Sequence, residues 1–248
     1  SCSVYPIVSK IYSTPLHTLF TWAKLCSVKP RAISDSSAFL IYALMSSFFF
    51  ISANVIIVFV FLRFFTIITT YSKLFNILVT KIKKPIVLDA DSLKQVDLSL
   101  IKNREDIILT PHIFEFKSFF NIDDDLKLDI DSYDFKKVDE NITGFQKITN
   151  QIKGTVVVKG QYDLILSGRN FKINKSGNPG MTVGGTGDAL AGIAASLLSQ
   201  GLSAFDSAAL AAFINGLAGD EAYEVKGNGF SATDLVSYIG QVIKNGLC

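Results

Sequence analysis

The sequence predicts an α/β protein in which helices cover both faces of a central, mostly parallel sheet. Short apolar runs closed by polar residues have the length of buried strands; they are Ile86–Leu88 in KKPIVLDADSL, the run in EDIILTPH, and Thr155–Val158 in GTVVVKG. Segments with helical polarity, such as residues 134–153, separate them. This alternation is typical of parallel sheets, because a parallel connection must cross the sheet. The length of 248 residues suits one large domain, which we expect over residues 1–248.

Residues 38–62 (AFLIYALMSSFFFISANVIIVFVFL) form a run of 25 residues without a charge, which is long enough to span a bilayer. The run contains serines and an asparagine, its middle is β-branched and aromatic, and no basic cluster on one side orients it. Two buried strands with a short link fit it equally well, because strands covered on both faces are continuously apolar. We expect the strands and no membrane contact. The first twenty residues also lack the basic-then-apolar order of a secretory signal.

The rest of the chain continues the alternation. Residues 164–166 are predicted as a strand, and the acidic segment 121–134 (NIDDDLKLDIDSYD) as a solvated loop. Ser203 and Ser231 each begin an S-x-x-D pattern that can cap a helix. The capping patterns predict two further helices, at residues 204–225 and 232–244.

Composition limits the classes of function. The 24 Lys and Arg residues nearly balance 22 Asp and Glu residues, so no duplex-binding surface is indicated and we expect no nucleic-acid partner. The three cysteines, Cys2, Cys26 and Cys248, form no CxxC pair, which argues against a disulfide framework or a zinc site. This cysteine usage fits a reducing cytosol, and we expect a cytoplasmic protein.

Glycine is distributed unevenly. All 17 glycines lie at or after Gly144, whereas ordinary usage of about 7% would place roughly ten before it. Because tight βα turns usually need glycine, the glycine-free residues 1–84 are predicted to be an atypical part of the domain.

Residues 174–201 (NKSGNPGMTVGGTGDALAGIAASLLSQG) contain seven of these glycines and lead into a helix. The helix has one apolar stripe, formed by Leu190, Ile193, Ala194, Leu197 and Leu198, and Gly201 is its predicted stop. Glycine loops before helices let backbone N–H groups approach an anion, and the helix N-terminus adds about half a positive charge. The predicted anion-facing turn consists of Gly184, Gly185, Thr186 and Gly187.

Asp188 lies in the first turn of that helix. A carboxylate repels phosphate, so its place beside an anion site indicates a general base that takes the proton from a hydroxyl attacking a phosphoryl group. The neighbouring amides would hold the charge that develops on the transferred phosphate. The alternative is an aspartate that only interacts with the helix dipole.

From about Pro85 to the C-terminus the chain resembles the ADP- or ATP-dependent NAD(P)H-hydrate dehydratases, a carbohydrate-kinase-like family. The segments GNPGMTVGGTGDALAG, VLDADSL, LTPHIFEF, VVVKGQYDLI, INGLAGDEA and SATDL carry the resemblance. It implies a ribokinase-like fold and the repair of hydrated NADH and NADPH. In that reaction the nucleotide phosphorylates the hydroxyl of the hydrate, and elimination of phosphate restores the dihydronicotinamide.

The resemblance also implies roles for single residues. Asp188 corresponds to the general base, which also contacts the hydrate, and the glycine turn ending at Gly187 to the anion hole. The loop that holds the nucleotide corresponds to Lys159, Gly160, Gln161, Tyr162 and Asp163. His112 corresponds to a hydrate-binding residue, with a turn histidine hydrogen-bonded to backbone as the alternative. Glu115 corresponds to a residue that orders Mg²⁺ through water, with a surface glutamate as the alternative.

The expected ligands are ADP or ATP with Mg²⁺, and NADH hydrate and NADPH hydrate as substrates of a homo-oligomer. Asp89 and Asp91 end a predicted strand at the site face, where one of them could instead cap a helix. The chain departs from the family pattern at residues 59–62 (FVFL), where a GPGLG turn is usual, at Ile113 and Phe114, where proline and glycine are common, and at Lys94, where Asn is frequent. A vitamin-alcohol kinase and a non-catalytic nucleotide-binding protein are the competing functions.

Overall fold

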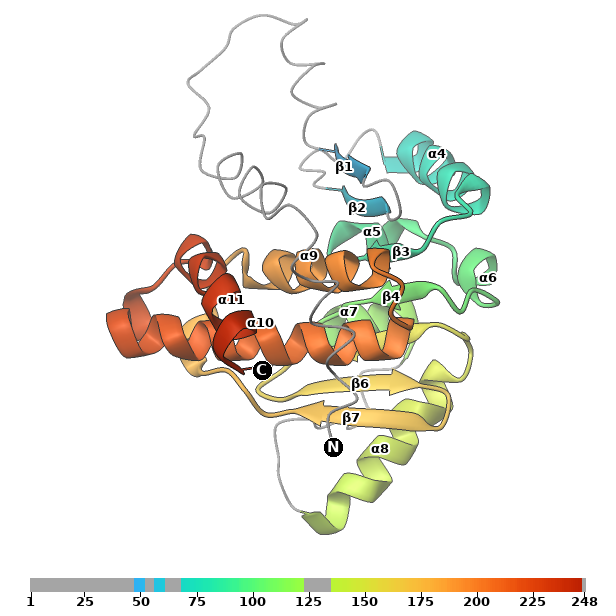
Figure 1. The fold of residues 1–248 in the computed structure, drawn as a ribbon. Helices are drawn as coiled ribbons and strands as arrows, with labels where there is room; N and C mark the ends of the chain where they lie inside the picture. The colour runs from blue at the N-terminus through green and yellow to red at the C-terminus, as the bar shows by residue number, and fades with distance from the viewer. Residues whose placement is uncertain (1–46, 52–55, 61–67, 123–134, 247–248) are drawn as a thin grey trace, which may run out of the picture.

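The computed structural model describes residues 47–51, 56–60, 68–122 and 135–246. The described strands form one seven-stranded sheet in the order β1-β2-β3-β4-β5-β6-β7 (Figure 1). Their bounds are β1 Ser47–Ile51, β2 Ile56–Val60, β3 Ile86–Leu88, β4 Ile107–Leu109, β5 Thr155–Val158, β6 Asp163–Ser167 and β7 Asn170–Asn174. The α-helices are α4 Ile68–Lys81, α5 Asp91–Gln95, α6 Leu98–Ile101, α7 Ile113–Phe119, α8 Phe135–Thr149, α9 Thr186–Ser199, α10 Ala204–Lys226 and α11 Ala232–Gly246.

The sheet is mixed, so the prediction of a mostly parallel sheet is confirmed in part. Among the described strands, β2 to β5 run parallel to one another, whereas β1 is antiparallel to β2, β6 to β5 and β7 to β6. The α/β prediction is confirmed, and the antiparallel pairs lie at the two edges of the sheet. Short links cannot join parallel strands, so hairpins extend the sheet there.

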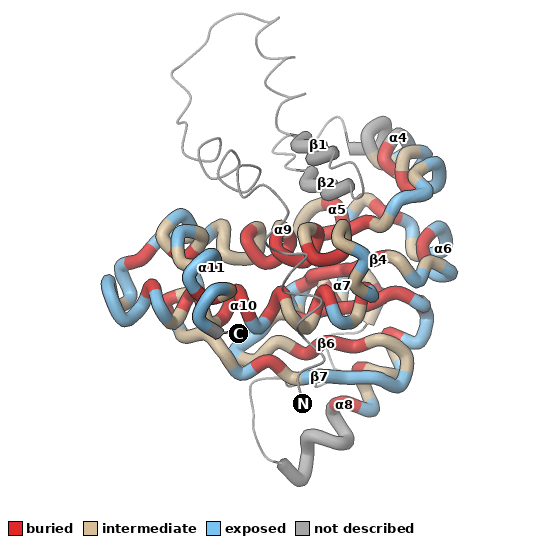
Figure 2. Tube along the Cα trace, viewed as in Figure 1, coloured by how far each residue is buried: buried red, intermediate tan, exposed pale blue. Residues whose placement is uncertain are grey.

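Helices cover both faces of the sheet, as predicted. Successive side chains of a strand point to opposite faces. On one face Val87, Ile108 and Val157 pack against α9, α10 and α11, and on the other Ile86, Leu88 and their neighbours pack against α4 to α8. The central strands and α9 are accordingly buried along most of their length (Figure 2).

The uncharged run 38–62 contributes β1 and β2, which pair antiparallel with Ser47 opposite Val60. The two predicted strands are confirmed at these bounds, and the rest of the run lies outside the described residues. No helix in the described ranges is long and apolar enough to cross a membrane. The acidic segment predicted as a loop also lies outside them, from residue 123 onward.

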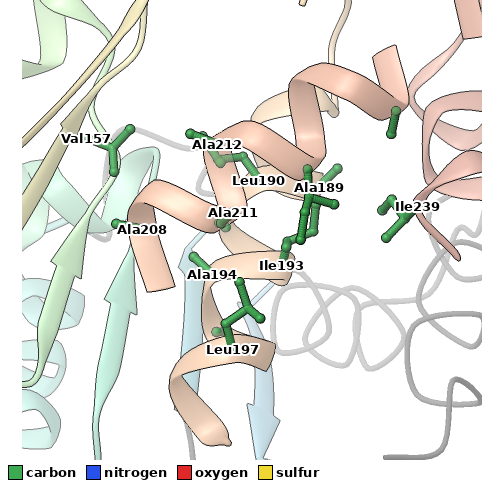
Figure 3. Packing of buried hydrophobic residues seen from close by; sticks show 14 of the residues in the cluster. Val157, Ala189, Leu190, Ile193, Ala194, Leu197, Ala208, Ala211, Ala212 and Ile239 are labelled. Carbon is green, nitrogen blue, oxygen red and sulfur yellow. The ribbon is translucent and has the colours of Figure 1, made fainter. Parts of the chain in front are cut away.

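Helix α10 packs across α9 through small side chains (Figure 3). Ala208, Ala211 and Ala212 are buried between the two helices and the sheet. Gly216 faces the chain leading out of β7: a Cβ there would lie 2.6 Å from both the carbonyl carbon and the oxygen of Ser176. The close approach places α10 directly behind the loop that precedes α9.

Helix α11 begins beside that loop and has the predicted cap. The Oδ2 of Asp234 accepts hydrogen bonds from the Ser231 N–H and hydroxyl, each 2.9 Å long, and its Oδ1 lies 2.7 Å from Lys226 Nζ. These hydrogen bonds lower the pKa of Asp234 to about 2, and the bond from Lys226 makes the largest contribution. At the start of α10 the Ser203 hydroxyl donates to Asp206 Oδ2 at 2.7 Å and accepts from the Asp206 N–H at 3.1 Å.

The Asp234 cap predicts a pH-dependent contribution to stability. Asp234→Asn should lower the free energy of unfolding at pH 7 by about 0.3–1 kcal/mol. Because the folded pKa is depressed, this difference should persist down to about pH 4 and vanish as the pH falls towards about 2. Urea unfolding of both proteins between pH 3 and 7 measures it; a difference that does not change with pH would contradict the assignment.

Candidate active site at the N-terminus of α9

The turn before α9 is held in a shape that only glycine adopts readily. Gly185 is the N-cap residue and has a φ of 101°, in the left-handed region. A Cβ there would also lie 2.9 Å from the Cβ of Ala232, at the start of α11. Thr186 secures the turn through its hydroxyl, which donates to the carbonyls of Met181 (2.8 Å) and Val183 (3.0 Å). The first turn of α9 is thus fixed with the N–H groups that lack intrahelical acceptors directed outward.

An ion pair lies against this first turn. Lys159 follows β5 and Asp89 follows β3, so both lie where the parallel strands end. Lys159 Nζ donates to Asp89 Oδ1 at 2.8 Å. A Cβ on Gly187 would lie 3.2 Å from that Nζ and 3.9 Å from Asp89 Oδ2. The missing side chain at Gly187 therefore leaves the space in which the ammonium lies.

Asp188 is the third charged residue here. It lies in the first turn of α9, as predicted, and it is half-buried. Burial raises the pKa of its carboxyl, the negative charge of Asp89 raises it further, and the positive charge of Lys159 opposes both. We call Asp89, Lys159, Gly187 and Asp188 the Lys159 cluster. A carboxyl with a raised pKa is a better proton acceptor than an ordinary aspartate.

The predicted nucleotide loop, residues 159–163, joins β5 to β6 beside the cluster. Gly160 and Gln161 are exposed, whereas Tyr162 and Asp163 are partly buried. Burial raises the pKa of Asp163, and hydrogen bonds from Asn174 and the Gly160 backbone, with the charge of Lys159, act in the opposite direction. Asn174 also donates to the Ala212 carbonyl at 3.1 Å, which connects this loop to α10.

His112 lies next to Lys159 through the backbone. The two residues form a parallel bridge, and the Lys159 N–H donates to the Pro111 carbonyl at 2.8 Å. The Nδ1 of His112 accepts from the N–H groups of Phe114 and Glu115, each at 3.2 Å, so it caps α7. These two bonds are expected of a turn histidine that is hydrogen-bonded to backbone, the alternative given for His112. It leaves Nε2 as the remaining nitrogen, and hydrate binding by His112 stays a prediction.

Glu115 completes the same capping box. Its Oε2 accepts from the His112 N–H at 2.9 Å, and its Oε1 lies 3.5 Å from His112 Nε2. No group of three or more His, Cys, Asp or Glu side chains in the described part of the chain could hold a metal ion. A carboxylate bound in this way suits a contact with Mg²⁺ through water better than direct ligation, and the role of Glu115 stays a prediction.

The structure thus brings Asp188, Gly187 and Lys159 together and separates Asp89 from Asp91. Asp91 lies in the first turn of α5 and pairs with Lys94 at the surface, at 2.7 Å. Sequence reasoning missed Asp220 and Asn178: Asp220 accepts from the Gly177 N–H (3.0 Å) and from Asn178 Nδ2 (2.9 Å). These bonds hold the GNPG loop on α10. Both residues lie in segments that carry the family resemblance, GNPGM and INGLAGDEA, but no local pattern indicated that the two pair.

The arrangement has the components of phosphoryl transfer to a hydroxyl. Helix amides and an ammonium can hold phosphate oxygens, and a carboxylate of raised pKa lies within the same turn.

Gly187→Ala should therefore weaken nucleotide binding about tenfold, because the Cβ crowds the ammonium. Gly192→Ala is the control, since a Cβ there meets nothing within 4 Å in the same helix. Calorimetric titration with ADP and ATP compares them, and unchanged affinity in Gly187→Ala would refute the crowding argument.

Known proteins are similar to this chain in sequence. A family model for NAD(P)H-hydrate dehydratase matches residues 69–241. The chain is 49% identical over 166 residues to a bifunctional NAD(P)H-hydrate repair enzyme of Methanothermobacter thermautotrophicus, covering 67% of this chain and 30% of that protein. It is 37% identical over 159 residues to an ADP-dependent (S)-NAD(P)H-hydrate dehydratase of Cenarchaeum symbiosum, covering 64% and 52%. The chain thus spans about a third to a half of the length of these relatives.

Solved structures share the fold. A ribokinase-like superfamily protein of Enterococcus faecalis has a TM-score of 0.61 at 22% identity, over 77% of this chain and 63% of that one. The ADP/ATP-dependent NAD(P)H-hydrate dehydratase of Bacillus subtilis, co-crystallised with ATP and Mg²⁺, has a TM-score of 0.51 at 22% identity, over 67% and 56%. The predicted ribokinase-like fold is confirmed. Because the family model matches well over half of the chain, this protein belongs to the NAD(P)H-hydrate dehydratase family.

Proposed function

We propose that this chain carries out the nucleotide-dependent dehydration of hydrated NADH and NADPH. The observation that carries the proposal is the Lys159 cluster, in which the Lys159 ammonium lies against the first turn of α9, the turn that contains Asp188 and the free amides. Family membership and the chemistry of this turn support the same reaction. The relatives named as ADP-dependent favour ADP as the phosphoryl donor.

In the proposed reaction Asp188 accepts the proton of the hydrate hydroxyl as its oxygen attacks the terminal phosphorus of the nucleotide. The turn from Gly184 to Gly187 and the Lys159 ammonium hold the transferred phosphoryl oxygens, while residues 159–163 hold the rest of the nucleotide. The phosphorylated hydrate then loses phosphate together with a proton from the adjacent ring carbon, and the ring double bond is restored. With ADP the products are the dinucleotide, AMP and phosphate, so the oxygen of the hydrate leaves in the phosphate.

Mg²⁺ would supply charge neutralisation on the nucleotide phosphates. We propose that Glu115 contributes to its water shell, and that His112 contacts the hydrate through Nε2. Neither role requires His112 or Glu115 to leave the capping box of α7.

The proposal is tested by adding the purified chain to NADH hydrate with Mg²⁺ and either ADP or ATP. The dihydronicotinamide absorbance should recover, and it should not recover when the nucleotide is omitted. A chain that phosphorylates a vitamin alcohol and leaves the hydrate unchanged would instead be a kinase of the same fold.

A further inference from the structure

Asp89 is the member of the Lys159 cluster to which the proposed reaction gives no role. It is 2% exposed, and its side chain reaches Lys159 Nζ at 2.8 Å. Its backbone carbonyl separately accepts from the Ser92 N–H at 3.2 Å and from the Ser92 hydroxyl at 2.6 Å. The backbone bonds hold the turn into α5, so the buried carboxylate is left to act on Lys159.

The ammonium of Lys159 lies where other forces would move it. The first turn of α9, directly against Nζ, carries the positive end of the helix dipole and repels a cation. Asp163 and Asp188 both interact with the charge of Lys159 and are alternative partners for it. A lysine side chain also loses considerable rotamer freedom when it is held in one place. The 2.8 Å hydrogen bond to Asp89 holds the ammonium in one position despite these opposing effects.

We infer that Asp89 is a positioning residue, which holds the Lys159 ammonium at the phosphate site and keeps it from pairing with Asp188. The inference rests on the proposed function, in which Lys159 binds phosphate and Asp188 is the base. Asp89 would act through Lys159 and need not touch the nucleotide or the hydrate.

Two consequences distinguish this role from a merely structural one. Without the Asp89 charge, Lys159 is no longer held for phosphate, so the affinity for ADP falls. The pKa of Asp188 also falls, because a negative neighbour is lost and the ammonium becomes free to approach. Within the described residues, the charged groups that shift the pKa of Asp188 are Asp89, which follows β3, and Lys159, in the β5–β6 loop. The base would therefore retain its charge at lower pH.

Asp89→Asn, which keeps the size of the side chain, is the test variant. Asp91→Asn is the matched control, because it removes a carboxylate two residues away that pairs with Lys94 at the surface. Calorimetric titration of the full chain with ADP should show about tenfold weaker binding in Asp89→Asn and normal binding in Asp91→Asn. Normal ADP affinity in Asp89→Asn would overturn the inference.

A double-mutant cycle with Lys159→Met shows whether Asp89 acts through Lys159. Asp89→Asn should cause no further loss of ADP affinity once Lys159 is methionine. Equal losses in both backgrounds would contradict the inference. If Asp89→Asn alone does not fold, the double variant is compared with Lys159→Met, because the double variant leaves neither partner of the ion pair unpaired. An ADP affinity lower in the double variant than in Lys159→Met would contradict the inference.

Carbon-13 titration of the Asp188 carboxyl supplies a readout that does not depend on turnover. The Asp188 titration should move to lower pH in Asp89→Asn and stay in place in Asp91→Asn; an unchanged Asp188 titration in Asp89→Asn would overturn the second half of the inference. A wild-type chain that binds ADP and leaves NADH hydrate unchanged would refute the proposed function while the binding cycle still decides the role of Asp89. A wild-type chain that binds neither ADP nor ATP would contradict both.

Discussion

Asp188→Asn is expected to lower turnover of NADH hydrate by about two to four orders of magnitude, the usual contribution of general base catalysis. Asparagine keeps the size of the side chain but cannot accept the proton of the attacking hydroxyl. Nucleotide affinity should persist or increase, because the glycine turn and Lys159 remain and one negative charge leaves the proposed phosphate site. Steady-state kinetics and calorimetric titration on one preparation separate the two effects.

Asp206→Asn provides the matched control. Asp206 lies in the first turn of α10 at the position that Asp188 holds in α9; its side chain accepts from the Ser203 hydroxyl at 2.7 Å and pairs with the exposed Lys172 at 3.6 Å. A first-turn aspartate that serves only the helix contributes about 0.3–1 kcal/mol to stability. Asp206→Asn should show only that loss, with normal turnover. If Asp188→Asn behaved in the same way, Asp188 would be structural.

The raised pKa of Asp188 predicts how turnover depends on pH. Turnover should fall on the acid side with the titration of Asp188, because the protonated carboxyl cannot act as a base. Since burial, with the charge of Asp89, raises that pKa, the acid limb should lie above the value of about 4 expected for an ordinary aspartate. A pH profile of kcat that remains flat down to pH 4 would contradict the assigned environment.

Gly216→Ala is expected to have the largest effect on stability. The new Cβ would lie 2.6 Å from the backbone of Ser176, which cannot turn aside as a flexible side chain can. Ser176 is itself held, because its hydroxyl donates to Asn174 Oδ1 at 2.7 Å and to the Phe213 carbonyl at 3.2 Å. Overpacking of this kind typically costs about 1–3 kcal/mol. We expect the upper part of that range, which is a fall in melting temperature of about 4–10 °C.

Gly240→Ala is the matched control for this substitution. Gly240 is exposed in the interior of α11, and a Cβ there meets nothing within 4 Å. Alanine should stabilise the helix by up to about 1 kcal/mol at such a site. Thermal unfolding of both variants should therefore give shifts of opposite sign. A Gly216→Ala protein as stable as Gly240→Ala would mean that α10 does not approach the Ser176 backbone as closely as the structure has it.

Local patterns were sufficient to predict the central elements. β3 and β5 have the predicted bounds, because each is a short apolar run closed by polar residues. Helices α10 and α11 begin where the S-x-x-D patterns indicated, and Ser203 and Ser231 make the capping bonds. The start of α9 and the place of Asp188 in its first turn followed from the glycines that precede it.

Other features depend on contacts that no local pattern records. β7 has mostly exposed side chains and a polar sequence, NFKIN, and its only signal was the turn at Gly168, which has a φ of 57°. The pairing of Lys159 with Asp89 joins residues 70 positions apart, so neither residue type nor spacing predicts it. The bonds from Gly177 and Asn178 to Asp220 likewise arise only once α10 packs behind the loop.

The measurement that tests the central claim most directly is the stoichiometry of one reaction mixture. NADH hydrate, Mg²⁺ and limiting ADP are incubated with the purified chain, and NADH, AMP and phosphate are measured together. Equal amounts of all three are expected, with at most about 1% of those amounts formed by Asp188→Asn over the same time. AMP and phosphate released without recovery of NADH, or NADH recovered without consumption of nucleotide, would contradict the account.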